Sequence, residues 1–405
     1  MNPCFKHRVP TISLYLDLVF AASLTMLFAC GTVSAESLQE NDKSSSESEW
    51  DENYEISHLE PIFISDGSAV PVEPSGILDS AVSELHYHPI IELQSRGLPD
   101  GQADIVVRGS VLENTGIKLG AVTLFDPQTG HYTAELPIDP MMLGTPDVLT
   151  GTQNAIYGFN ANVATINYDW LPVSDRRALE FGVGTDGFLS QKVQFGQVFP
   201  LAGVSDLGVE LSLFKASGDG TRNNGDFDFE RASGRVQRFS PTSQTDLVLG
   251  YQDKFYGWPG AYTGFASLPE TDQPISSLYL ANHLEKHQHG HTEIGVYHRQ
   301  VDDDYDFDRT TAESGVPGAF DHVTKTSAIG IGGKHQLSDV AINYQLQYTS
   351  DELTESTDLT SGPFVSRDYL AVRIAPEKSW QLDDSQSVDV LVGLGYDGSN
   401  RDSSA

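Results

Sequence analysis

Acidic side chains gather in two stretches of the chain that could bind a metal ion. The candidate ligands are Asp219, Asp226, Asp228, Asp302, Asp304 and Asp306. Carboxylate oxygens at this density suit Ca²⁺, a hard cation that prefers several oxygen ligands. Both stretches read as long polar loops, so solvated acids on an outer loop are the simpler interpretation. Calcium remains a hypothesis beside that one.

Aromatic side chains are concentrated at 255–262. Rings that line a pocket can bind a planar ligand or a sugar. Anchoring at a membrane interface explains Tyr256 and Trp258 equally well. The candidate ligand-binding residues are Tyr132, Tyr256, Trp258 and Tyr262.

Three histidines, His287, His289 and His291, alternate through a short polar segment. Alternate residues of an extended segment share a face, so a Zn²⁺ or Cu²⁺ site is conceivable. Gly290 favours a polar hairpin turn instead, and we prefer that interpretation.

Other classes of function are disfavoured. Neither His131 nor Asp126 has a nucleophile–base spacing, and no glycine-rich phosphate loop precedes a lysine. We therefore expect no enzyme and no required cofactor. The net charge of −33 argues against nucleic-acid binding, which needs a basic face.

The first 35 residues read as a signal peptide. Lys6 and Arg8 supply the positive region, 12–29 is mostly apolar, and Val33-Ser34-Ala35 suits cleavage. An uncleaved anchor and lipidation at Cys30 are the alternatives. The other cysteine is Cys4, so a mature chain would have no disulfide.

Residues 36–76 are rich in serine and acids and predict a flexible arm. It contains a short β-prone run at 60–65, which could add as a strand to the sheet edge of a partner. Residues 77–172 predict a small α+β domain. We expect its strands at 105–107, 122–124 and 164–168 and a short helix at 140–149.

From residue 179 onward, apolar and polar residues alternate with period two, which predicts strands. We expect eleven, at 178–184, 189–199, 207–216, 228–239, 245–256, 276–286, 292–301, 322–335, 340–350, 366–375 and 387–397. Short connections alternate with long polar ones, and several apolar faces end in tyrosine. A soluble sandwich would also alternate, but these features favour a membrane β-barrel over 173–405.

No segment after the leader is apolar for long enough to form a spanning helix, so a membrane protein of this sequence must use strands. Eleven strands is an odd number, and a barrel that encloses a ninety-residue domain needs on the order of 22. We therefore expect a mainly β protein, an α+β domain followed by about half of a ~22-stranded barrel, with the chain truncated.

Residues 104–168 resemble the plug of TonB-dependent outer-membrane receptors. The run 107–109 is similar to the family's arginine–glycine strand end, 146–151 to its acidic–valine–leucine–arginine–glycine run, and 155–158 to its tyrosine–glycine turn. The motif residues are Arg108, Gly109, Asp147, Gly151, Tyr157 and Gly158. Gly120-Ala121, Thr150 and Asn162 depart from the pattern.

This resemblance implies a receptor in the bacterial outer membrane that contacts the lipid bilayer and imports a bulky, scarce nutrient. Siderophore–iron and a cobalamin-like ligand are the first candidates. The partner would be a periplasmic TonB-type protein. Its candidate TonB box is Glu60, Pro61, Ile62, Phe63, Ile64 and Ser65. The acidic loops resemble the calcium-binding loops of some vitamin B12 receptors. A passive or structural barrel is the alternative function.

Overall fold

The computed structural model describes residues 78–95, 100–201, 205–265, 267–311, 319–356, 364–382 and 386–403. They all belong to one compact unit. The predicted signal peptide, the arm and the TonB box at 60–65 lie outside the described residues. No helix in the described part is long and apolar enough to cross a membrane.

Residues 78–173, which we call the N-terminal unit, fold around two small sheets. The larger has the order β4-β3-β6-β5, in which β3 and β6 are parallel and the other pairs are antiparallel. Its strands are β3 (Thr115–Leu119), β4 (Val122–Leu124), β5 (Asp147–Thr150) and β6 (Ala164–Tyr168). The smaller sheet pairs β1 (Ile91–Ser95) with β2 (Ala103–Val107). Ile117, Leu124 and Ile166 are fully buried between these layers.

The helical elements of this unit are short. They are the 3₁₀ turns η1 (Ser83–Tyr87), η2 (Leu112–Asn114) and η3 (Pro140–Met142) and the helix α2 (Gly151–Tyr157). The helix predicted at 140–149 is therefore wrong. Gly144 and Pro146 interrupt it after one turn, because proline restricts the residue before it to extended backbone. The predicted strands at 122–124 and 164–168 are confirmed as β4 and β6.

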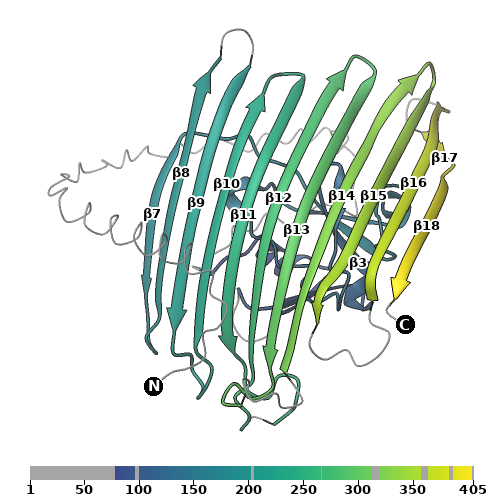
Figure 1. The fold of residues 1–405 in the computed structure, drawn as a ribbon. Helices are drawn as coiled ribbons and strands as arrows, with labels where there is room; N and C mark the ends of the chain where they lie inside the picture. The colour runs from purple at the N-terminus through teal and green to yellow at the C-terminus, as the bar shows by residue number, and fades with distance from the viewer. Residues whose placement is uncertain are drawn as a thin grey trace, which may run out of the picture. The chain divides into compact units, whose positions relative to one another are not determined.

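The second part of the chain is a wide antiparallel sheet, which we call the strand wall (Figure 1). Its strands are β7 (Arg176–Val183), β8 (Leu189–Pro200), β9 (Asp206–Gly218), β10 (Phe227–Phe239), β11 (Ser243–Gly257), β12 (Thr271–His287), β13 (Gly290–Asp306), β14 (Ala319–Leu337), β15 (Val340–Ser356), β16 (Phe364–Gln381), β17 (Ser387–Leu391) and β18 (Leu394–Ser403).

The last two strands share one position in the wall. Glu377 of β16 pairs with Leu391 of β17, and Ile374 of β16 pairs with Leu394 of β18. The backbone N–H of Val392 donates to Pro376 between them. The twelve strands thus occupy eleven positions, and the eleven predicted strands are confirmed.

The two faces of the strand wall differ in polarity. Large apolar side chains are exposed on the outward face, among them Leu179, Phe195, Leu211, Val236, Leu247, Leu249, Tyr279, Val296, Ile329 and Tyr348. The inward face buries polar groups, among them Ser212, Arg235, Gln237, Asp246, Gln252, Asn282, Gln345 and Gln347. A soluble protein would reverse this pattern, because exposing apolar area to water costs about 25 cal/mol per Å². The outward face therefore suits lipid.

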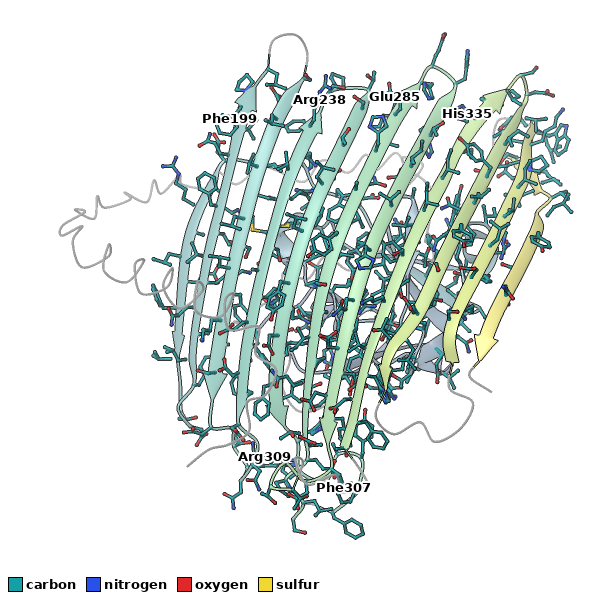
Figure 2. All side chains as sticks on the ribbon, in the orientation of Figure 1. Phe199, Arg238, Glu285, Phe307, Arg309 and His335 are labelled. Atoms are coloured by element: carbon teal, nitrogen blue, oxygen red, sulfur yellow. The ribbon has the colours of Figure 1, made fainter. Side chains whose placement is uncertain are left out.

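Connections at the two rims differ in length, as the sequence predicted. Phe199, Arg238, Glu285 and His335 mark the rim of short turns, and Phe307 and Arg309 mark the rim of long loops (Figure 2). At the long-loop rim the strands extend further than predicted: β12 begins at Thr271, and β13 continues to Asp306.

Candidate ligand-binding face and the contacts of the N-terminal unit

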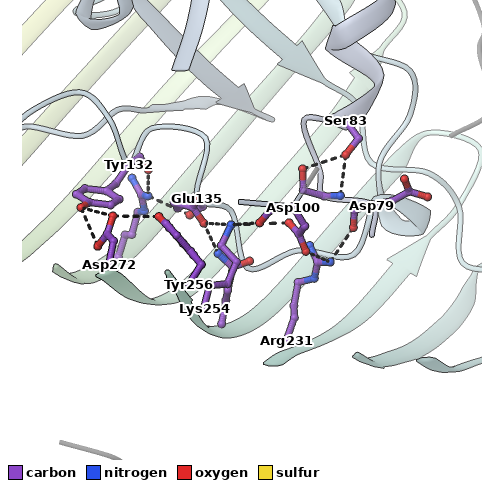
Figure 3. A network of polar contacts seen from close by, with 12 residues as sticks. Asp79, Ser83, Asp100, Tyr132, Glu135, Arg231, Lys254, Tyr256 and Asp272 are labelled. Atoms are coloured by element: carbon purple, nitrogen blue, oxygen red, sulfur yellow. Dashed lines mark hydrogen bonds and ion pairs between the residues drawn. The ribbon is translucent and has the colours of Figure 1, made fainter. Parts of the chain in front are cut away.

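A chain of buried charges joins the N-terminal unit to the strand wall (Figure 3). The Lys254 Nζ of β11 lies 2.5 Å from Glu135 Oε2 and 3.7 Å from Asp100 Oδ1. The Gln252 amide donates to the same Glu135 oxygen at 2.6 Å. Arg231 Nη2 of β10 reaches Asp100 Oδ2 at 3.2 Å. Each carboxylate comes from the N-terminal unit and each cation from the wall.

Burial raises the pKa of two carboxylates in or beside this network of charges. It raises the pKa of Glu135 above its ordinary value, and Lys254 offsets part of that rise. Burial likewise raises the pKa of Asp79 to about 6, with Lys192 acting against it. Arg231 donates to the Asp79 carbonyl at 2.7 Å, so this aspartate lies beside the same network.

A second charged anchor is Asp139, just before η3. Lys192 Nζ lies 3.1 Å from its carboxylate, and the Ser212 hydroxyl donates to it at 2.5 Å. Burial opposes ionisation here, but Lys192, Arg231 and the hydrogen bonds outweigh it, so the pKa of Asp139 is lowered. Asp139 also accepts from the backbone N–H of Met141 at 3.0 Å, which caps η3.

Tyr132 connects the N-terminal unit to two carboxylates of the wall. Its hydroxyl lies 2.6 Å from Asp303 Oδ1 and 3.3 Å from Asp272 Oδ2. Tyr256 donates to Asp272 Oδ2 at 3.0 Å. Burial, followed by the charges of Asp272 and Asp303, raises the pKa of Tyr132, so it stays a hydrogen-bond donor.

Neutral hydrogen bonds hold the unit elsewhere. Gln347 of β15 accepts from the Thr123 N–H at 2.8 Å and donates to the Thr123 carbonyl at 2.9 Å. Ala121 donates to Asn282 at 3.0 Å and accepts from Gln345 at 2.8 Å. Its carbonyl lies 2.3 Å from where a Cβ of Gly330 would be, so this close approach requires glycine.

The four predicted ligand-binding residues are brought together at the long-loop rim. Ring centroids are 5.0 Å apart for Tyr256 and Trp258 and 5.1 Å apart for Trp258 and Tyr262. Tyr132 joins through Asp272, which Tyr256 also contacts. Tyr132, Tyr256 and Trp258 are buried, whereas Tyr262 is 44% exposed. Tyr262 is therefore the member of the four that a ligand can touch without rearrangement.

Sequence reasoning missed three residues of this face. Gln102 accepts from the Tyr262 hydroxyl at 3.2 Å, and the Tyr305 ring lies 5.3 Å from the Tyr262 ring. The Glu270 carboxylate accepts from the backbone N–H groups of Tyr262 at 2.9 Å and Thr263 at 3.1 Å. These contacts fold the β11–β12 loop against the N-terminal unit. No local motif marks them, because the partners are distant in sequence.

The placement of Asp302, Asp304 and Asp306 in a loop is wrong. All three lie in β13, with Asp302 and Asp304 on its outward side and Asp303 buried between them. The backbone of β13 here pairs with β12 on one side and with β14 on the other. This pairing outweighs the low preference of aspartate for strands.

The other predicted calcium ligands lie at the β9–β10 connection. Asp228 is the second residue of β10, and Asp226 accepts from Arg309 at 2.8 Å. The Asp219 N–H donates to the Asp186 carbonyl at 2.8 Å. In the described part of the chain, no group of three or more His, Cys, Asp or Glu side chains is arranged to hold a metal ion. Calcium binding stays a prediction.

The plug-like motif residues lie at bends of the N-terminal unit. Arg108, Gly109 and Gly151 have positive φ angles of 52°, 70° and 56°. Arg108 donates to Thr150 at 3.4 Å, where the family pattern has a second arginine. Tyr157 donates to Asn343 of β15 at 3.0 Å.

The other two motif residues flank α2. Asp147 opens β5, and burial raises its pKa. Gly158 follows the last residue of α2, and a Cβ there would lie 2.3 Å from the Asn154 side chain. Beside α2, a cavity of about 980 Å³ is lined by Asn154, Tyr369, Arg373 and Asp397, among others.

Comparisons with known proteins add the fold family. No family model and no curated protein sequence matches the chain. Among solved structures, it is similar to the siderophore receptor PirA from Pseudomonas aeruginosa, with 15% identity, a TM-score of 0.53, and coverage of 81% of this chain and 55% of that one.

Two further structures agree. The outer-membrane ferripyoverdine receptor of Pseudomonas aeruginosa has 11% identity and a TM-score of 0.57 over 79% of this chain and 50% of its own. The ferric yersiniabactin uptake receptor FyuA from Yersinia pestis has 14% identity and a TM-score of 0.55 over 80% and 57%. The chain thus spans about half the length of the structures it matches.

These likenesses confirm the predicted fold class. The matched structures are receptors and transporters rather than enzymes. The chain has the fold of the TonB-dependent outer-membrane receptors.

Proposed function

We propose that the protein is an outer-membrane receptor that actively imports a bulky, scarce nutrient, with siderophore–iron or a cobalamin-like ligand as the first candidates. In this proposal 1–35 is a cleaved signal, 36–76 a flexible arm, 77–172 the plug and 173–405 part of the barrel. Likeness to a siderophore receptor and to a ferric yersiniabactin uptake receptor supports the class.

One observation carries the proposal. Among the described strands, none of the N-terminal unit pairs with a strand of the wall, because its sheets are separate from the wall's sheet. The unit is held through side chains such as Lys254 and Gln347. A neutral hydrogen bond such as those of Gln347 contributes about 1 kcal/mol, and breaking a buried pair such as that of Lys254 costs about 3–5 kcal/mol. A partner could therefore move the unit without breaking a β-ladder.

The long-loop rim supplies the ligand side of the proposal. Tyr262 is exposed there and also contacts Gln102 of the N-terminal unit. A ligand that displaces the Tyr262 ring would change a contact of the unit directly. Binding can then shift the population of unit conformations by its differential affinity for them.

Energy would enter through a TonB-type protein that adds a strand to the candidate box at 60–65. The test is uptake by cells that produce the protein, with ⁵⁵Fe bound to citrate, to a hydroxamate siderophore or to a catecholate siderophore, and with labelled cyanocobalamin. Deleting 60–65, or adding a protonophore, should abolish uptake. Deleting the six arm residues at 44–49 is the matched control and should leave uptake intact.

A passive or structural barrel is the alternative function. Uptake that survives both the 60–65 deletion and the protonophore would establish passive entry and overturn active import. Absence of uptake for all four probes would instead refute the proposed nutrient classes.

A further inference from the structure

Two histidines from different strands meet at the short-turn rim. His287 ends β12 and pairs with Gly290, the first residue of β13, which in turn pairs with His335 of β14. Gly290, which has no side chain, therefore lies between the two histidines in the sheet. Their centroids are 5.6 Å apart, and the ring planes are inclined by 27°.

The gap between them is fixed by the backbone. Gly290 has a φ of +150°, and a Cβ at this position would lie 1.9 Å from the Lys334 carbonyl oxygen. No other residue fits here without moving β14, so the space over Gly290 is kept open for the two rings.

Both rings face away from the N-terminal unit. Leu278, Leu280 and Asn282 of β12 are buried inward, so His287, which has the opposite parity, points outward. On β14, Ala328 is buried and Ile329 is exposed. His335 is an even number of residues from Ile329, so it lies on the same outward face. His335 lies at the rim of short turns (Figure 2). The pair can thus be reached from water beside the membrane.

Neighbouring groups orient one ring of the pair. Thr292 Oγ1 lies 3.0 Å from His335 Nε2 and 3.0 Å from the Tyr344 hydroxyl. The His335 ring also stacks on Tyr344, at 5.8 Å between centroids and 12° between planes. With Nε2–H donating to Thr292, the lone pair of His335 is on Nδ1. Histidines that bind metals typically have their second nitrogen held in this way.

The His287 ring is available to bind a metal ion. Among the described residues, no hydrogen bond or ion pair involves the His287 imidazole. Apart from Cys4 and Cys30, both within the first 35 residues, the chain has no cysteine that could compete as a ligand. Two imidazole ligands without thiolate suit late first-row divalent ions, for which Cu²⁺ has the highest affinity.

We infer that His287 and His335 form a site for a divalent transition metal, Cu²⁺ most tightly, with water completing the coordination. The site has two protein ligands, which is why it differs from the larger groups excluded above. His287 is exposed and His335 is half-buried, so a bound metal would be exchangeable. The site lies on the outward face, so it does not depend on the proposed transport function.

This site replaces the one considered from the sequence. His291 belongs to the inward-facing parity of β13 and His289 lies in the turn, so neither stacks on His287. The actual partner is 48 residues away in sequence, which the register of three strands brings into place.

The test is titration of the purified full chain in detergent with Cu²⁺ alone, followed by electron paramagnetic resonance. Nitrogen hyperfine splitting should mark one equivalent of bound metal. His287→Ala and His335→Ala should each weaken that equivalent at least tenfold. Thr292→Val keeps both ligands but removes the orienting hydroxyl, and should weaken binding about tenfold.

His298→Ala is the matched control, since His298 is also outward-facing and bonds Ser327 at 2.8 Å; it should bind like the wild type. If His335→Ala fails to fold, His335→Asn, which keeps a polar side chain at the rim, replaces it. Equal affinity in the wild type and the His287 and His335 variants, or no saturable equivalent at all, overturns the inference.

Discussion

The side-chain amide of Gln347 bonds both backbone groups of Thr123, at 2.8 Å and 2.9 Å. A single glutamine of the strand wall thus takes the place of a neighbouring strand along the free edge of β4. Buried backbone groups need such partners, because leaving them unpaired is costly.

Gln347→Leu should therefore release β4. Two buried backbone groups would lose their partners, at a cost of about 2–4 kcal/mol in total. Hydrogen exchange read by mass spectrometry on a 121–125 peptide should show loss of protection at Thr123. Gln300→Leu is the control, because the Gln300 amide contacts Asp302 on the same strand. Unchanged protection in Gln347→Leu would contradict the proposed role.

Lys254→Met should lower the stability of the N-terminal unit more than the removal of a charge at an exposed position. It leaves the buried carboxylates of Glu135 and Asp100 without this cation, and breaking a buried pair costs about 3–5 kcal/mol. Lys378→Met, which removes an exposed pair with Asp339, should change stability much less than Lys254→Met, because water screens an exposed pair. Urea unfolding, followed by tryptophan fluorescence, measures both. Similar midpoints for the two variants would refute the ranking.

The double variant Lys254→Met/Glu135→Leu provides a second check. It removes the cation together with one of the two carboxylates that depend on it. It should recover part of the stability lost in Lys254→Met, because one uncompensated buried charge is gone. A simple sum of the two single effects would mean that Lys254 and Glu135 do not interact.

Stability of the N-terminal unit should fall as pH rises from about 4 to about 6 through Asp79. The pKa of Asp79 in the fold is about 6, against an ordinary value of 3.8, because burial favours the protonated form. The folded state therefore binds more protons than the unfolded state in this window. Asp79→Asn should raise the thermal midpoint at pH 7 and change it little at pH 4.

Glu113→Gln, at an exposed position of the same unit, is the control for the overall charge of the chain. It should shift the midpoint equally at both pH values. A midpoint difference between Asp79→Asn and the wild type that does not depend on pH would show that the pKa of Asp79 is the same in the folded and unfolded states.

The aromatic residues of the long-loop rim should separate into two kinds. Trp258→Ala removes a buried side chain and should destabilise the fold by about 3–5 kcal/mol. Tyr262→Phe loses the bond to Gln102 and should cost about 1 kcal/mol. Tyr262→Ala should raise the KM for uptake with little change in the thermal midpoint. A Tyr262→Ala protein with wild-type KM would show that the ligand does not contact this ring.

The strand wall could be predicted because apolar and polar residues alternate within the sequence of each strand. Strand β15, for example, alternates Ile342, Tyr344 and Leu346 with polar residues that face the N-terminal unit. The extra length of β12 and β13 was not predictable, because aspartates such as Asp302 read as loop until their pairing partners are known.

The candidate site was predictable in part. Tyr256, Trp258 and Tyr262 are neighbours in sequence, so their proximity in space follows from one strand end. Gln102 and Tyr305 join them from far along the chain, and no spacing rule connects them. The same limit applies to His287 and His335, whose meeting depends on the register of three strands.

Glu270 binds two successive backbone N–H groups of the β11–β12 loop, at Tyr262 and Thr263. Its carboxylate therefore shapes the loop before any ligand arrives. Ordering a loop during association consumes affinity, and a loop that is already ordered avoids that loss. If the rim binds a ligand as proposed, the contacts of Glu270 mean that this loop does not have to be ordered during binding.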